Sequence, residues 1–169
     1  MVSTIVTAVD GSGHSNKAVE FAVDMARKFG AHLIFVHALE EGRVPDELMR
    51  MAEVEHIVQT PDPESRIPRV AVPHGGDDRE AETVRIHAFV GNQILEDAKS
   101  TAKQNGVNSV ETVIGTSDPA ASILDEASAK NADMIIMGSR GFSTLKGLLL
   151  GSVSQKVTHH AKCTTVCVR

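Results

Sequence analysis

The sequence predicts a doubly wound α/β protein, in which helices cover both faces of a parallel sheet. Short runs of apolar and β-branched residues alternate with longer stretches of helical periodicity along most of the chain. Runs such as IVTAV and MIIM are almost wholly apolar, as expected for strands covered on both faces. The length of 169 residues, 41% of them apolar, suits one domain spanning residues 1–169.

The first 38 residues contain one strand–helix–strand unit. The predicted elements are a strand at 3–9, a helix at 15–29 and a strand at 32–38. The apolar stripe of the helix comprises Ala18, Val19, Ala22, Val23, Ala26 and Phe29. Gly30 stands where a helix commonly ends in a left-handed residue. This order predicts a parallel crossover, with the turn Asp10-Gly11-Ser12-Gly13 at the end of the first strand.

The alternation resumes in the second half of the chain. The predicted elements are a helix at 79–105, a strand at 107–114, a helix at 119–130, a strand at 133–137, a helix at 152–161 and a strand at 164–168. Asp118 followed by Pro119 predicts a helix start. The expected core faces comprise Ala88, Ile94, Leu95, Ala98 and Ala102 in the long helix, and Ala121, Ile123, Leu124 and Ala127 in the next.

Residues 40–82 differ in composition from the rest of the chain. They contain five of the six prolines and 12 acidic against 5 basic residues. Residues 46–58 could form a helix, whereas 60–78 show no periodicity. We interpret 40–82 as a long acidic excursion from the domain, and we favour a tolerated insertion over a functional lid.

Composition and charge exclude several classes of protein. The net charge is −5, yet residues 134–169 contain no Asp or Glu and carry five basic residues. A small basic end on an acidic body suggests a site for a small anion rather than a nucleic-acid surface. Trp and Tyr are absent, which argues against base stacking on aromatic side chains. Because no long apolar run or signal-peptide pattern is present, we expect a cytoplasmic protein without membrane insertion.

The segment 138–154, GSRGFSTLKGLLLGSVS, contains the clearest candidate site. It follows a predicted buried strand and precedes a helix, so it lies where ligands bind in open α/β sheets. Gly138 and Gly141 permit close approach of the backbone, and Gly151-Ser152 marks a helix start that favours an anion. Arg140 could add a charge-assisted contact. The alternative is that the glycines only end strands and that Ser152 is only an N-cap.

Other chemistry-bearing patterns are absent or weak. The chain has no Walker A motif, no complete GxGxxG and no GxSxG nucleophile elbow. The set His159, His160, Cys163 and Cys167 matches no common zinc spacing, so we expect no metal site there, and the two cysteines suit ordinary buried thiols. No second carboxylate or histidine is clearly placed beside Asp10, so we assign no catalytic residue.

The spacing Gly138-x2-Gly141-x9-Gly151-Ser152 resembles the nucleotide-binding pattern of the universal stress protein family. The stretches MGSRG, LKGLLLGSVSQKV, VTAVDGS and LIFVHAL are similar to the same family, in the same order. The resemblance implies a three-layer fold of the adenine nucleotide alpha hydrolase type, with five parallel strands in the order 3-2-1-4-5. It also implies binding of ATP, ADP or AMP, and a homodimer.

Carried over by position, the resemblance implies a set of binding residues. Asp10 would contact the ribose, and the backbone of Ala8, Val9 and Ala38 would line the adenine. Met137 and Gly138 would close the pocket for base and ribose. Arg140, Gly141, Gly151, Ser152 and Val153 would hold the phosphates, with Ser154 nearby. From chemistry alone, Asp10 could instead be a general base or cap the following amides in an Asx turn.

Our leading hypothesis is a stress-response protein that binds ATP and acts as a nucleotide-dependent sensor or regulator of an unidentified protein partner. An Mg²⁺ ion could accompany the phosphates. One alternative is a slow ATPase or phosphotransferase using the same site, and another is an interaction module that does not use nucleotide. The apolar strand 164–168 is expected at a sheet edge, where antiparallel pairing with a second copy would form the homodimer.

Overall fold

The computed structural model describes residues 1–38, 78–115, 118–142 and 149–169, with side chains of the long helix described from residue 87. The elements in chain order are β1 (Thr4–Ala8), α1 (Gly13–Phe29), β2 (His32–Ala38), α3 (Asp78–Gln104), β3 (Val110–Gly115), α4 (Pro119–Ala129), β4 (Met134–Gly138), α5 (Ser152–His160) and β5 (Thr164–Val168). The strand order is β3-β2-β1-β4-β5, and every neighbouring pair is parallel. This confirms the predicted sheet and its order.

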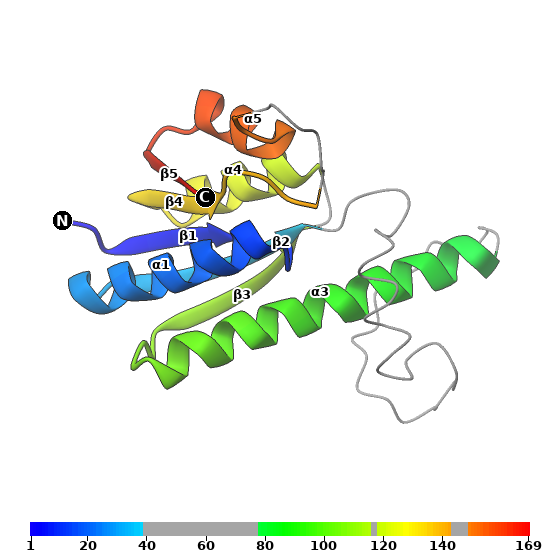
Figure 1. Cartoon of the computed structure of the whole chain (residues 1–169), viewed down its shortest axis with the longest axis horizontal. Coiled ribbons are helices and arrows are strands. Elements are labelled where there is room, and N and C mark those ends of the chain that lie inside the picture. Colours follow the sequence, from blue (N-terminus) through cyan, green and yellow to red (C-terminus); the bar gives the residue numbers. More distant parts are fainter. Residues whose placement is uncertain (39–77, 116–117, 143–148) are drawn as a thin grey trace.

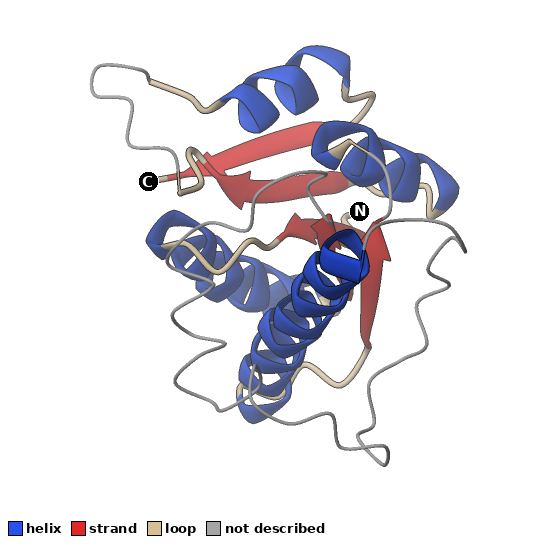
Figure 2. Cartoon of the chain, turned by 90° about the vertical axis from the view of Figure 1, so that its right-hand side faces the viewer, coloured by secondary structure: helices blue, strands red, loops and turns tan. Residues whose placement is uncertain are grey.

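The helices form a layer on each face of the sheet (Figures 1 and 2). Alternate residues of the central strands point to opposite faces, so Ile5, Phe35 and Ile136 pack with α1 and α3. Their neighbours Val6 and Ile135 pack with α4 and α5. All five are fully buried. Because both faces of the strands are covered, the strand sequences are apolar at successive positions rather than at alternate ones.

Residue chemistry explains where several helices begin and end. Ser12 is the N-cap of α1 and accepts a hydrogen bond from Ser15 N at 3.3 Å. Gly30 ends that helix in the left-handed region, at a φ of 65°. The Asp118 carboxylate accepts from Ala121 N at 3.0 Å and begins α4 as predicted. No helix in the described ranges is long and apolar enough to cross a membrane.

Most predicted boundaries differ from the observed ones by one or two residues, and those at the two ends of α3 have a clear consequence. The third strand begins at Val110 rather than at residue 107, because the preceding residues still close the end of α3. Gly106 N donates to Lys103 O and Val107 N donates to Ala102 O. The helix α3 begins at Asp78, so residues 78–82 belong to it and not to the acidic excursion. The predicted helix at 46–58 lies outside the described residues.

The predicted core faces were right for α3 and partly wrong elsewhere. The five core residues expected in α3 are all buried. Phe29 is 41% exposed, because it is the last residue of α1 and the buried face of that helix ends at Ala26. In α4 the buried side chains include Ala120 and Ser122, whereas the expected Ala121 and Leu124 are only partly buried.

Candidate functional site

The residues predicted to line a nucleotide base lie at the carboxyl ends of three adjacent strands. Ala8 ends β1, Ala38 ends β2, and Gly138 ends β4. β1 lies between the other two strands, and the chain leaves it toward β2 through α1. In open α/β sheets the ligand crevice forms at such a point, where the order of the strands reverses direction. The structure therefore brings these predicted residues together at one edge of the sheet.

Asp10 follows β1 and is held by the turn that leads into α1. Its Oδ1 accepts a hydrogen bond from Ser12 N at 2.9 Å, which makes the expected Asx turn. Its own amide donates to Ser15 Oγ at 3.0 Å. The other carboxylate oxygen, Oδ2, lies toward Gly141, where an added Cβ would stand 2.5 Å from it. One oxygen thus maintains the turn, and the second faces the glycine-bracketed segment.

The two described ends of the segment 138–154 are joined through one carbonyl group. Ser139 O accepts from Gly151 N at 2.7 Å and from Ser154 Oγ at 2.9 Å. Ser139 N in turn donates to Val168 O at 2.6 Å, beside the end of β5. Ser139 and Ser154 are both buried. These contacts bring the two glycine turns side by side, while residues 143–148 lie outside the described ranges.

The helix α5 begins at this junction, and its first amides have no hydrogen-bond partner among the described residues. Its N-cap is Gly151, which provides no side-chain cap, and the first helical hydrogen bond runs from Gln155 N to Gly151 O. The amides of Ser152, Val153 and Ser154 precede that bond, and such amides have no intrahelical carbonyl to pair with. Together with the helix dipole, they form a geometry that favours an anion. The interpretation of Ser152 as an N-cap was wrong, because the helix begins at Ser152 itself.

The burial of the side chains shows which predicted site residues could contact a ligand through the backbone. Met137 is 3% exposed and Val153 is partly buried, and both pack into the core beneath α4 and α5. Only their backbone groups are therefore available to a ligand. Ser154 Oγ lies within hydrogen-bond distance of the carbonyl oxygens of both Ser139 and Gly151. This hydroxyl therefore stabilises the contact between the two ends of the segment.

Arg140 is the described cation within the glycine-bracketed segment. Its side chain is partly buried, and within the described ranges its Nε is buried without a hydrogen-bond partner. Lys156, on α5, is instead engaged with Asp118 at 3.0 Å. A charge-assisted hydrogen bond to an anion would satisfy this buried guanidinium nitrogen.

Sequence reasoning missed three residues that shape the site. Ser15 and Ser139 stabilise the two loops through the contacts given above. The sequence around these serines gave no sign of that role. His37 is buried beside the end of β1, and its Nδ1 lies 2.8 Å from Val9 O. The apolar residues that surround His37 in the strand were the sequence feature that could have indicated its role.

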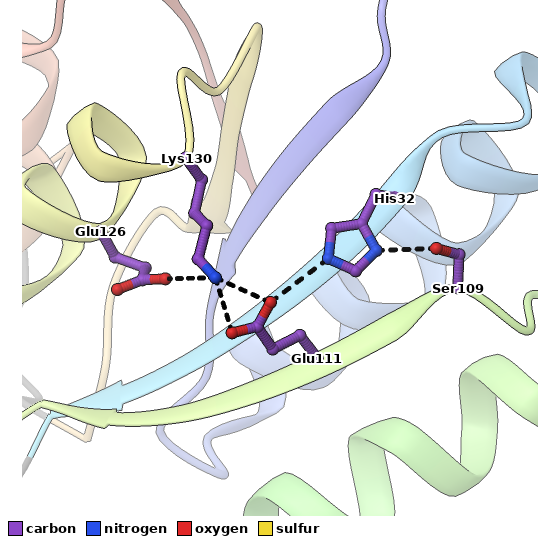
Figure 3. Close-up of polar contacts among 5 residues, drawn as sticks. All are labelled: His32, Ser109, Glu111, Glu126 and Lys130. Atoms are coloured by element: carbon purple, nitrogen blue, oxygen red, sulfur yellow. Dashed lines mark hydrogen bonds and ion pairs between the residues drawn. The ribbon is translucent and has the colours of Figure 1, made fainter.

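A second polar cluster lies at the opposite, amino end of the sheet (Figure 3). Ser109 Oγ lies 2.8 Å from His32 Nδ1, and His32 Nε2 lies 3.4 Å from Glu111. Lys130 contacts both oxygens of Glu111, at 2.7 and 2.9 Å, and Glu126 at 3.8 Å. The hydrogen bond from Lys130 lowers the pKa of Glu111. Because His32, Glu111 and Lys130 are substantially exposed, and only Glu126 is mostly buried, we interpret the cluster as an ion-pair network that joins β2, β3 and α4.

The histidines and cysteines near the C-terminus do not gather into a cluster. In the part of the chain that the structure describes, no group of three or more His, Cys, Asp or Glu residues is arranged to hold a metal ion. Cys163 and Cys167 are free and partly buried, so they are less buried than expected. His14 lies in the first turn of α1, at the helix start as expected, and its backbone is close to Gly138.

The fold and this site define a doubly wound α/β protein with converging backbone donors at the carboxyl ends of its strands. The chain matches the universal stress protein family over residues 1–169 and belongs to that family. It is 33% identical over 169 residues to universal stress protein YxiE of Bacillus subtilis, with all of both chains covered.

Solved structures agree with this assignment. Universal stress protein UspA from Lactobacillus plantarum superposes with a TM-score of 0.73 at 18% identity, covering 99% of this chain and 98% of that one. A universal stress protein solved in complex with cAMP has a TM-score of 0.63 at 25% identity, covering 99% and 97% of the two chains. The first similarity concerns the fold, and the second includes a protein that binds an adenine nucleotide.

Proposed function

We propose that this protein binds ATP, or another adenine nucleotide, at the carboxyl ends of β1, β2 and β4. The observation that carries the proposal is the convergence of Asp10 Oδ2, Gly141 and the start of α5 at one edge of the sheet. The complex of a related universal stress protein with cAMP supports the same ligand class.

The residues present fit such a ligand. Asp10 Oδ2 would accept hydrogen bonds from ribose hydroxyls, while the backbone of Ala8, Val9 and Ala38 would line the base. The amides at the start of α5 and the Arg140 side chain would bind phosphate oxygens, and Gly141 leaves room for them. The remaining members of the proposed binding set are Met137, Gly138, Gly151, Ser152, Val153 and Ser154. An Mg²⁺ ion would be held chiefly by the phosphates.

We further propose a regulatory role, in which nucleotide occupancy changes the partner that a cytoplasmic homodimer binds. β5 is an edge strand and is rich in apolar residues, which supports pairing with a second copy through residues 164–168. On the side of β5 that faces β4, Thr164 N donates to Asp133 O, and Val168 O accepts from Ser139 N. The alternation of a strand therefore directs the amides of residues 165 and 167 outward, toward a second strand.

Mass spectrometry of small molecules released from freshly purified protein tests the ligand directly. An adenine nucleotide in the released fraction is the expected result. Because the chain has no Trp or Tyr, nucleotide absorbance would also dominate the ultraviolet spectrum of the purified protein. If no nucleotide is released, ATP, ADP, AMP and cAMP are each added at about 100 times a micromolar Kd, where binding would raise the Tm by about 5–10 °C. The absence of released nucleotide together with an unchanged Tm would overturn the proposal.

A further inference from the structure

His37 joins the end of β1 to the helix α3. Leu33 and Phe35 point toward α1 and α3, and His37 continues this row at the carboxyl end of β2. Its side chain is buried, with the residue 8% exposed. The Nδ1 atom lies 2.8 Å from the carbonyl oxygen of Val9, the residue that directly precedes Asp10.

A glycine in α3 makes room for this imidazole ring. A Cβ atom added at Gly91 would lie 2.5 Å from Cδ2 of His37 and 3.0 Å from Nε2, which is too close for any side chain. Glycine in a helix interior costs about 1 kcal/mol relative to alanine, so this position gives up helix stability to accommodate the ring. One turn further along α3, Ile94 approaches Gly11, where an added Cβ would lie 3.1 Å from Cδ1. The same stretch of α3 therefore contacts the turn after β1 both directly and through His37.

The hydrogen bond determines the state of the ring. Burial lowers the pKa of His37, although the Val9 carbonyl and Asp10 oppose this effect, and the imidazole is therefore neutral at pH 7. Since a carbonyl oxygen only accepts, the single proton is on Nδ1. Val9 N donates to Val36 O at 2.9 Å and is therefore occupied, whereas the Val9 carbonyl oxygen has a second lone pair that a base can use. The ring and β2 together hold the orientation of the Val9 backbone.

We propose that His37 is a positioning residue for base recognition, which holds the Val9 backbone in the orientation that distinguishes adenine from guanine. This inference rests on the proposed function, in which Val9 lines the base. Adenine and guanine differ in the donors and acceptors on their edges, so recognition by backbone groups depends on the orientation of those groups. The phosphate contacts lie on the other loop, at 138–154, and do not pass through His37.

The test compares the affinities of ATP, GTP and inorganic tripolyphosphate by isothermal titration calorimetry. His37→Ala removes the donor, and we expect the preference for ATP over GTP to fall about 3- to 10-fold, the value of one neutral hydrogen bond. The affinity for tripolyphosphate should remain unchanged. His37→Asn retains an amide donor near the Nδ1 position and should retain the preference. His160→Asn, at the exposed end of α5, is the matched control.

Gly91→Ala provides an independent variant that keeps the histidine. Its Cβ would displace the ring, so it should lower the base preference as His37→Ala does. In the His37→Ala background the space is empty, and Gly91→Ala should then cause no further loss. An equal loss of affinity for all three ligands would indicate a merely structural role. That result, or an unchanged preference in His37→Ala, would overturn the inference.

The outcome remains decisive if the wild-type protein binds none of the three ligands. The proposed function would then fail, and hydrogen exchange of the amides of residues 9–12 would test the positioning role by itself. Faster exchange in His37→Ala than in His37→Asn would support a role of the Nδ1 donor in holding this turn. Equal exchange in the two variants would refute it.

Discussion

Replacement of Gly141 by alanine should weaken nucleotide binding with little effect on folding. The added Cβ would lie 2.5 Å from Asp10 Oδ2 and 3.7 Å from Asp10 Cγ, and it would meet no other heavy atom of the described residues within 4 Å outside its immediate chain neighbours. Gly141 does not have a positive φ, so alanine fits its backbone conformation. The Asp10 carboxylate must therefore move, although its Oδ1 is tied to Ser12 N.

The size of the effect follows from the interaction that is lost. A hydrogen bond to a charged group is worth about 1.5–3 kcal/mol, so loss of the contact between Asp10 and ribose should raise the Kd for ATP about 10- to 150-fold. The Tm without ligand should change by no more than a few degrees, because the substitution leaves the apolar core unchanged. Calorimetric titration with ATP and thermal unfolding without ligand measure the two quantities.

Two controls make this prediction refutable. Gly13→Ala is the matched glycine substitution, because a Cβ there meets no described atom within 4 Å, and its Kd should equal that of the wild type. In an Asp10→Ala background, Gly141→Ala should add little, since the group that it displaces is already absent. Independent, additive losses in the double variant would refute the argument that Gly141 acts through Asp10.

Other predictions concern stability and assembly. Hydrogen bonds from Ser3 to the Asp133 carboxylate lower its pKa, so Asp133→Asn should lower the Tm at pH 7. This contribution is present above the ordinary pKa of 3.8 and is lost as the pH falls through the lower folded value, so the Tm difference should disappear in acid. Ile135→Ala, at a fully buried position, should cost about 2–5 kcal/mol in denaturant unfolding. Thr165→Pro removes an outward amide of β5, and sedimentation should change from twice 18.0 kDa to 18.0 kDa; a wild type already at 18.0 kDa would refute the dimer.

The fold could be predicted because its determinants are local and repeated along the chain. Strands covered on both faces need successive apolar residues, and the helices carry stripes with caps at residues such as Gly30 and Asp118. The rotation of a short helix about its own axis, which decides which residues face the core, is less well determined by the sequence. In α4, Ala120 and Ala121 are adjacent in the sequence, so periodicity alone did not distinguish Ala120 from Ala121 as the buried residue.

The sequence indicated the parts of the candidate site in which the backbone requires glycine. It did not indicate the residues whose role depends on tertiary packing. The spacing of Gly138, Gly141 and Gly151 indicated the segment, and the structure places its ends beside Asp10. The role of His37 depends on the face of β2 that it occupies and on the space that Gly91 leaves in α3, more than 50 residues later in the chain. No local pattern encodes that contact, since Gly91 alone looks like a weak point in a helix.

The environments of these glycines separate positions that serve folding from positions that serve a ligand. A Cβ at Gly138 would lie 2.9 Å from the backbone of His14, and one at Gly91 would overlap the His37 ring. Protein atoms therefore fill the space beside both, and substitution there disturbs packing. Within the described residues, the nearest atom to a Cβ at Gly151 would lie 3.4 Å away, an ordinary contact, and a Cβ at Gly141 would conflict with Asp10. Among the described residues, an added side chain at these two positions would therefore meet Asp10 or the segment 138–154 itself, and not the apolar core. The proposed anion would approach the backbone at these two glycines, and substitution there is expected to affect ligand binding more than packing of the core.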